Sequence, residues 1–246
     1  MLGREVATCD TGSVSSGSDR GGMLSAEQRT LVWQALKFPR GRYTAERAGQ
    51  LSAVPSRTLH DWATSGTLVP DWMAASPRGW SYRDIVYVRM LAWLRSKRMA
   101  RTRASSRVRA VRALVARSRI DPDIRSDGSM FLIGGEKEDR FTGQQAFDGL
   151  NELLDVFHLT EPIEGVSTSE LWGPSLLHPS EHTYISPWVL HGEPCVAESR
   201  IPSAALYTLN VERGLGAAEI SALYPSLSEA EVEDAIDLEK RLRRAA

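Results

Sequence analysis

The chain has 246 residues, of which 42% are hydrophobic and 25% charged, an ordinary composition for a globular protein with one large or two small cores. No apolar run approaches the roughly 18–20 residues of a membrane span, and the first residues lack the charged-then-apolar order of a secretory signal. The two cysteines, Cys9 and Cys195, lie far apart and give no disulfide framework, so we expect a cytoplasmic protein.

The net charge of −1 hides a strong asymmetry along the chain. Residues 29–119 contain 19 Lys/Arg and 4 Asp/Glu, a balance of +15, whereas residues 120–246 contain 9 Lys/Arg and 23 Asp/Glu, a balance of −14. A basic half can bind a polyanion, which an acidic half would repel. The asymmetry therefore predicts two domains with different partners.

The N-terminal part divides into a tail and a folded domain. Residues 1–22 are rich in Ser and Gly, so we expect them to be disordered, or an extension that precedes a true start at Met23. Residues 23–120 are expected to form a DNA-binding domain that opens with a helix over 24–37.

Two short amphipathic helices follow, separated by a tight break. Ala45, Ala48 and Leu51 share one helical face, and Pro55 suits the first turn of a new helix over residues 56–64. Gly66 ends that helix. A helix, a short turn and a second helix with a polar, basic leading edge can place side chains in a major groove.

At these residues the chain resembles the MerR-type winged helix-turn-helix family. The motifs that carry the resemblance are Tyr43-Thr44, residues 54–59, residues 65–68, and a wing over residues 78–84 that leads into a helix over 85–95. The resemblance implies a homodimer that binds double-stranded operator DNA at paired half-sites. The effector cysteines and long coiled coil of that family are not evident, so metal sensing is not implied.

The candidate DNA contacts fall into three groups. For base contact we expect Ser56, Arg57, Thr58 and His60, although His60 could equally touch phosphate or have a structural role. The phosphate or wing candidates are Arg40, Arg42, Tyr43, Arg78 and Arg83. The wing tryptophans, Trp72 and Trp80, could lie along DNA or pack into the core.

A third group of candidates lies on a basic helix. Residues 95–119 carry ten basic and no acidic side chains, with Val108, Val111, Leu114 and Val115 in helical period. We expect Arg101, Arg109 and Arg112 to run along phosphates, and the alternative is a solvated helix face. Residues 121–157 then predict a β-hairpin around Asp127-Gly128 and a helix over 144–157, and residues 158–177 a linker.

Residues 178–246 are expected to form a helical interaction domain. Short strands at 184–189 and 195–196 precede three helices, over 202–212, 217–223 and 229–243, the last with a capping box of Ser228 and Glu231. Its motifs, 192–196, 200–202, 214–220 and 224–228, resemble a bacterial domain-of-unknown-function family, number four hundred and thirty-three. That resemblance implies a homeodomain-like three-helix fold and an antitoxin of the VapB type paired with a PIN-domain ribonuclease toxin.

Other side chains of this domain carry more than one interpretation. Lys240, Arg241, Arg243 and Arg244 are candidates for toxin binding, or they complement the dipole at the end of a helix. Arg200 is expected to make a structural ion pair or turn contact, with a direct functional role as the alternative. His178, His182, His191 and Cys195 could nominally bind zinc, but Pro179 and Pro194 interrupt the two pairs, and no metal or other cofactor is expected.

No catalytic signature is present: the sequence has no P-loop, no dinucleotide-binding glycine motif and no nucleophile with a plausible base, so no enzyme is expected. The expected fold is mainly α with small β elements, a winged helix-turn-helix followed by a three-helix domain. The expected function is that of an antitoxin that neutralises a ribonuclease and represses its own operon. The alternatives are a one-component regulator with a ligand-binding C-terminal domain, and a structural DNA-binding protein.

Overall fold

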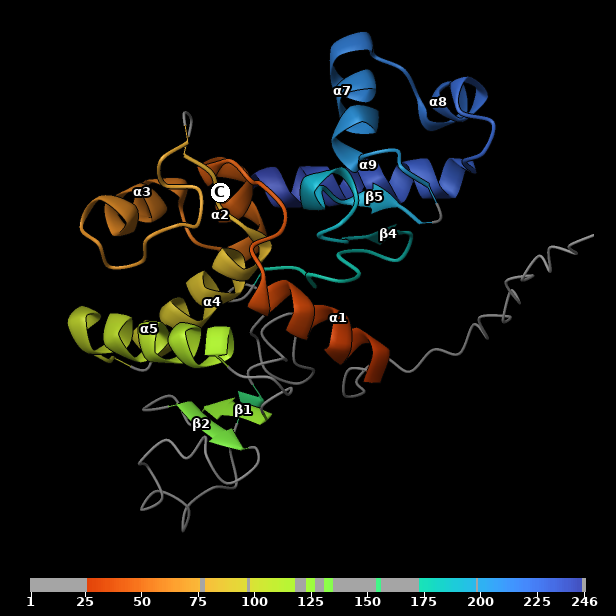
Figure 1. Cartoon of the computed structure of the whole chain (residues 1–246). Helices are drawn as coiled ribbons and strands as arrows, with labels where there is room; N and C mark the ends of the chain where they lie inside the picture. The colour runs from red at the N-terminus through yellow and green to blue at the C-terminus, as the bar shows by residue number, and fades with distance from the viewer. Residues whose placement is uncertain are drawn as a thin grey trace, which may run out of the picture.

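The computed structural model describes residues 26–75, 78–96, 98–117, 123–126, 131–134, 154–155, 173–197 and 199–244. It is mainly helical with small β elements, which confirms the fold class at that level (Figure 1). The predictions for residues 1–22, for most of the linker and for most of the helix at 144–157 lie outside the described residues. None of the described helices has the length and apolar character needed to cross a bilayer.

Five helices build the N-terminal unit: α1 (Ala26–Lys37), α2 (Ala45–Ser52), α3 (Ser56–Thr64), α4 (Tyr82–Ser96) and α5 (Arg101–Arg117). The single basic helix predicted over 95–119 is wrong, because the chain breaks between α4 and α5. Arg98 takes the left-handed φ of 64° there, and the Arg95 guanidinium donates to the Met99 carbonyl at 2.6 Å across the break.

The predicted β-hairpin is confirmed. Strands β1 (Asp123–Ser126) and β2 (Phe131–Gly134) pair antiparallel, with Ser126 opposite Phe131. A third strand, β3 (Leu154–Asp155), pairs with the other edge of β1 and gives the order β2-β1-β3. The helix predicted over 144–157 is therefore wrong at Leu154–Asp155, where the sheet ladder has overridden the helical period.

The C-terminal unit begins with a two-stranded sheet of β4 (Thr183–Tyr184) and β5 (Cys195–Val196), joined through the 3-10 turn η3 (Leu190–Gly192). Helices α7 (Ser203–Arg213), α8 (Ala217–Leu223) and α9 (Glu229–Arg244) follow close to their predicted bounds. The capping box is confirmed, because Ser228 N donates to the Glu231 carboxylate at 2.7 Å and Glu231 N to Ser228 Oγ at 3.3 Å. The strand predicted over 184–189 ends at Tyr184.

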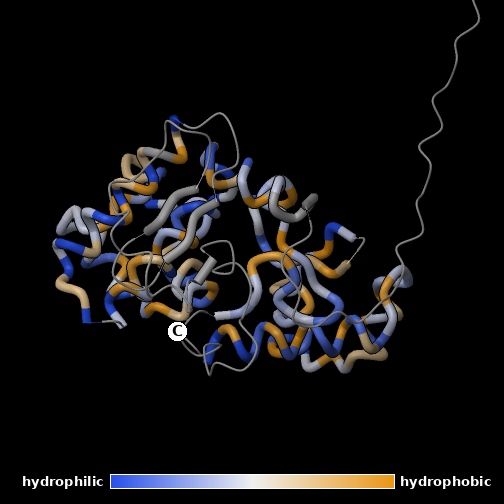
Figure 2. Tube along the Cα trace, turned by 90° about the horizontal axis from the view of Figure 1, so that it is seen from below, coloured by the Kyte–Doolittle hydropathy of each residue, from blue (hydrophilic) through white to orange (hydrophobic). Residues whose placement is uncertain are grey.

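Two hydrophobic cores form, and the larger one is shared between the units. The smaller core lies among α7, α8, α9 and β5, and Figure 2 shows apolar and polar residues alternating along the helices. The larger core combines α1–α5 with Leu176, Leu177, Ile185, Leu238 and Leu242. Residues 173–177, predicted as the end of a linker, thus pack into the core, and the C-terminal end of α9 lies beside α2 (Figure 1).

A loop of the C-terminal unit docks on the segment before α2. The Tyr43 hydroxyl donates to the Gly192 carbonyl at 2.8 Å, and Arg42 N donates to the His191 carbonyl at 2.9 Å. Gly192 has φ +91°, and a Cβ placed there would lie 1.9 Å from Tyr43 Oη, so only glycine fits. Tyr43 is 1% exposed, which corrects its prediction as a DNA contact.

A buried ion pair links the two units at the same junction. The Arg47 guanidinium of α2 donates twice to the Glu239 carboxylate of α9, at 2.6 and 3.0 Å, and once to Glu193 at 2.9 Å. Ser203 Oγ donates to the same Glu239 carboxylate at 2.6 Å. Burial works against the charge on Arg47, but the hydrogen bond and the charge of Glu239 outweigh it and raise the pKa of Arg47 above its usual value.

Two further contacts extend the junction toward α4. Arg89, whose side chain is fully buried, donates to the Leu51 carbonyl at the end of α2 and to the Pro174 carbonyl at 2.5 Å. The Tyr82 hydroxyl donates to the Leu176 carbonyl at 3.1 Å. The segment 173–177 is therefore held by side chains of α4 as well as by its own buried leucines.

Gly192→Ala tests the fit of the docking loop. We expect it to lower the free energy of unfolding by more than about 2 kcal/mol, because a left-handed backbone strain adds to the clash with Tyr43. Gly214→Ala is the matched control, because Gly214 has φ +67° with open space around it. Its substitution adds the backbone strain without a clash and should lower the free energy of unfolding by about 1 kcal/mol. Urea unfolding of both variants compares the two costs, and equal costs would contradict the close contact at Gly192.

A double-mutant cycle tests the ion pair. Arg47→Met should lower the free energy of unfolding by roughly 3–5 kcal/mol, because it leaves the buried Glu239 carboxylate without its hydrogen-bonded guanidinium. Glu239→Gln should cost less, because Arg47 keeps its contact with Glu193. The double variant should lose less than the sum, with a coupling energy on the order of 1–3 kcal/mol. Glu233→Gln, at an exposed position of the same helix, should have little effect. Additive losses in urea unfolding would show that the pair contributes no interaction of its own.

Candidate nucleic-acid interface

The turn between α2 and α3 is tight because two residues allow it. Ala53 caps α2 in the left-handed conformation with φ 53°, and Val54 N donates to the Gly49 carbonyl at 3.2 Å. A Cβ on Gly49 would lie 2.7 Å from the Val54 carbonyl oxygen, so glycine lets the turn fold back against α2. The break predicted around Pro55 lies where α3 begins.

Helix α3 buries one face and exposes the other. Leu59, Trp62 and Ala63 are buried against the N-terminal core. Of the four base-contact candidates, Arg57 and His60 are exposed, and Ser56 and Thr58 are half-buried. The structure thus brings all four to the start of one helix, with two of them fully available to a ligand. Asp61 and Thr64 share the exposed face.

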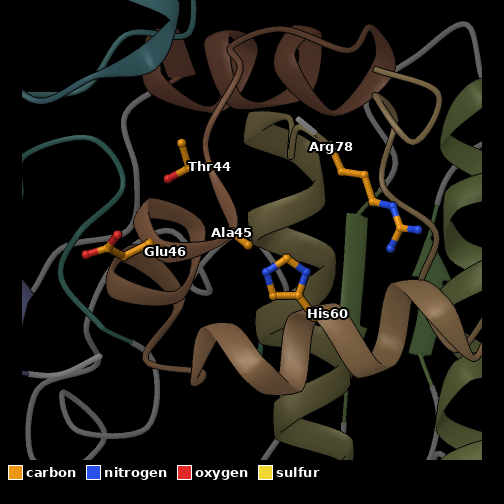
Figure 3. A pocket seen from close by; sticks show the side chains of 5 residues that line it. All are labelled: Thr44, Ala45, Glu46, His60 and Arg78. Carbon is orange, nitrogen blue, oxygen red and sulfur yellow. The ribbon is translucent and has the colours of Figure 1, made fainter. Parts of the chain in front are cut away.

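His60 lies in a shallow hollow of ≈ 350 Å³ beside α3, lined by Thr44, Ala45, Glu46, His60 and Arg78. Figure 3 shows His60 projecting from α3 and Arg78 from the opposite loop toward the same space. The Arg78 guanidinium donates to Thr64 Oγ1 at 3.4 Å, which connects this loop to the end of α3. Glu46 was not predicted as a site residue. Its place in the first turn of an amphipathic helix was the sequence feature that could have identified it.

The wing loop is held to the segment before α2. Tyr43 and Trp80 form an antiparallel bridge, and the Trp72 indole donates to the Gly41 carbonyl at 3.0 Å. Trp80 is 1% exposed, so it belongs to the core, and Trp72 is half-buried with its N–H satisfied. Arg40 and Arg42 remain exposed on the segment that these contacts fix.

Two predicted phosphate contacts have a structural role instead. Arg83 forms a bidentate ion pair with Asp71 at 2.6 and 2.7 Å, and Arg112 contacts both Asp71 and Asp84. Burial alone would raise the pKa of Asp71, but hydrogen bonds from Arg83 and Ser81 and the charge of Arg112 hold it below its usual value. Burial and the neighbouring Asp71 raise the pKa of Asp84 to about 6. These side chains connect the wing to α4 and α5.

Helix α5 keeps the predicted amphipathic character. Ala104, Val108, Val111 and Val115 are buried, and Ser105 Oγ donates to the Thr67 carbonyl. Arg101 and Arg109 are exposed as predicted, together with Arg103 and Arg117. In the described part of residues 30–117 the exposed acidic side chains are Glu46 and Asp61, whereas the exposed basic ones are Arg40, Arg42, Arg57, Arg78, Arg95, Arg98, Arg101, Arg103, Arg109 and Arg117. The exposed surface of this unit is therefore strongly basic.

The basic end of α9 is partly engaged. The Arg243 guanidinium stacks 4.5 Å from the centre of the Tyr207 ring, and Lys240 pairs with Asp237 at 3.0 Å. Arg241 and Arg244 are exposed. The same end carries Leu238, Glu239 and Leu242, which are buried, so α9 does not end as a free tail.

The nominal zinc residues have other surroundings. Cys195 is buried, its thiol donates to the Glu193 carbonyl at 3.3 Å, and burial raises its pKa to about 11. His191 is exposed with a left-handed φ of 60°. Within the described residues no three His, Cys, Asp or Glu side chains form a group that could hold a metal ion.

Residues 184–237 match a family described as a protein of unknown function, DUF433. No curated protein and no solved structure matches the chain. The matched segment runs from β4 into α9 and includes Gly192, Glu193 and Ser203, three residues of the junction, with Glu239 two positions beyond its end. The segment from β4 to α9 is thus similar to DUF433 domains.

Proposed function

We propose that this protein is a DNA-binding antitoxin: α3 reads operator DNA, and the C-terminal unit holds a PIN-domain ribonuclease toxin. The observation that carries the DNA-binding half is the exposed face of α3. Arg57 and His60 stand on a helix whose opposite face is buried, next to Arg78 of the wing loop. We take this arrangement to act as a winged helix-turn-helix, in which Arg57 would bind a guanine edge and the half-buried Ser56 and Thr58 would make short contacts.

The surrounding surface supports binding of a polyanion. The exposed arginines of α5 and of residues 40–42 would contact phosphates, adding affinity without sequence choice. Arg83 and Arg112 would contribute only by holding the wing in place. Operator sites are usually paired, so the DNA-bound form is proposed to be a homodimer.

The antitoxin half rests on the C-terminal unit. Its sequence is similar to DUF433, a family often found in toxin–antitoxin-like contexts. Its three helices enclose a core of their own, and its acidic surface would be repelled by DNA. A protein partner suits such a surface better than an operator does.

Arg57→Ala tests the reading helix. With the duplex selected by the wild-type protein from random DNA, we expect the affinity to fall about tenfold to a hundredfold, because a bidentate base contact contributes roughly 1–3 kcal/mol of discrimination. Arg109→Ala should weaken binding to all duplexes alike. It should also reduce the slope of the logarithm of the affinity against the logarithm of the salt concentration by about 1. Fluorescence anisotropy over a range of salt concentrations measures both effects.

Arg213→Ala, an exposed arginine at the end of α7, is the matched control and should leave DNA binding unchanged. Equal affinity for selected and unselected duplexes, unaltered by Arg57→Ala, would contradict a reading role for α3. A steep salt slope without sequence preference would instead favour a structural DNA-binding protein.

Co-expression with the product of the adjacent reading frame tests the antitoxin half. We expect a stable complex in which the partner's ribonuclease activity is suppressed. Arg241→Glu with Arg244→Glu should weaken suppression if the end of α9 reaches the nuclease, and these exposed positions spare the buried Leu238, Glu239 and Leu242. Glu229→Lys with Glu233→Lys, at the other end of α9, is the control for charge alone. A protein that purifies alone and leaves the nuclease active would favour a one-component regulator.

A further inference from the structure

Arg200 is an exposed arginine of the C-terminal sequence motifs whose side chain makes no hydrogen bond or ion pair with the described residues. It was expected to make a structural ion pair or turn contact, yet among the described residues its exposed guanidinium has neither a carboxylate nor a carbonyl partner. By contrast, the buried or half-buried Arg47, Arg83 and Arg112 have a carboxylate partner, and the buried Arg89 donates to backbone carbonyls. The structural interpretation of Arg200 is therefore not supported.

The described residues on either side of Arg200 are nevertheless held by hydrogen bonds. Val196 N donates to the Ile201 carbonyl at 3.0 Å, which closes the turn, and Ile201 N donates to Ser199 Oγ at 3.2 Å. The Tyr184 hydroxyl donates to the Ser199 carbonyl at 2.9 Å. Both neighbours of Arg200 are thus fixed by hydrogen bonds while its own side chain extends outward. A backbone held in this way lowers the entropic cost of binding.

Arg200 lies on a groove of about 700 Å³ between this turn and the loop before α9. The lining residues are Ala197, Ser199, Arg200, Ile201, Ser226 and Glu231. Ser226 is exposed and makes no hydrogen bond to the described residues, whereas the Glu231 carboxylate is engaged by Ser228 N and Oγ, both at 2.7 Å. The groove therefore offers one guanidinium and one hydroxyl that donate to none of the described residues, beside the apolar surface of Ile201 and Ala197.

We propose that this groove binds an acidic side chain of a protein partner, with Arg200 as the bidentate donor and Ser226 as the second donor. Carboxylates match the planar fork of a guanidinium, and the apolar floor suits a residue next to the acidic one. The proposal rests on the part of the proposed function that gives the C-terminal unit a protein partner, and it does not depend on DNA binding.

Two observations select a protein segment over other anions. Exposed acidic side chains lie on the same unit, among them Glu181, Glu229 and Glu233, and they repel a densely charged polyanion such as DNA far more than a segment with one carboxylate. Arg200, Ser226 and Ala197 are all exposed, so the groove is too open to enclose a small ligand. An extended segment can cover an open groove and place one carboxylate on Arg200.

The test is a selection of random-sequence peptides on the full-length protein, followed by fluorescence polarisation with the enriched peptides. We expect the enriched peptides to share an Asp or Glu beside an apolar residue. Arg200→Gln should weaken their binding about tenfold or more, because a charge-assisted pair is lost. Arg200→Lys should retain part of the affinity, and Arg213→Gln should retain all of it.

Replacing the shared Asp or Glu of the peptide by Asn or Gln should cause the same loss of affinity for the wild-type protein. This measurement does not require an Arg200 variant, so it applies even if such a variant is unstable. Enrichment of no acidic motif, or of peptides that bind Arg200→Gln equally well, would overturn the proposal. So would a loss of DNA affinity in Arg200→Gln without a loss of peptide affinity. DNA binding by the wild-type protein is measured separately, so failure of the reading helix and failure of this groove give different results.

Discussion

The structure depends on a guanidinium placed between two units of opposite charge. Removing Arg47 and Glu239 from water costs several kcal/mol for each ion, and this cost is offset only when the geometry is good and the remaining lone pairs are satisfied. Both conditions hold here, because the pair is bidentate and Ser203 and Glu193 complete the hydrogen bonds around it. A buried pair of this kind favours one arrangement of the two units, since any displacement leaves a buried charge alone.

The same ion pair also constrains the position of α3. Arg47 belongs to α2, and α2 is joined to α3 by a turn in which Gly49 and Val54 are in close contact. The other end of α2 is held by Arg89, which also holds residues 173–177. The C-terminal unit thus contacts α2 through Arg47, and the segment that precedes this unit shares Arg89 with the other end of α2. A partner that stabilises the C-terminal unit acts on a body that includes α3, which would couple the two proposed activities by mass action.

Much of the helical layout could be predicted from the sequence, and the reasons are local. The period of apolar residues, the position of Pro55 and the capping box of Ser228 and Glu231 each depend on neighbours in the chain, so α3 and α9 were found within a residue of their ends. The junction could not be predicted, because it joins residues more than a hundred positions apart. Glu239 on an otherwise apolar helix face was the available signal, and it did not identify Arg47 as the partner. Tyr43, Arg83 and Arg112 were assigned to DNA for the same reason: residue type alone cannot tell a surface cation or aromatic ring from one that a distant carboxylate or carbonyl has bound.

The division of the arginines follows from solvation. An arginine that the fold buries must have a carboxylate or carbonyl partner, since a bare buried charge would unfold the domain. Arg47, Arg83 and Arg89 satisfy this rule and thereby lose the capacity to bind a ligand. An arginine that the fold leaves exposed needs no partner within the chain, so its guanidinium stays available to a ligand. Arg57 stands in this position on the basic unit and Arg200 on the acidic one, and the charge around each favours the ligand that we propose for it: a polyanion for the first, a single carboxylate on a protein for the second.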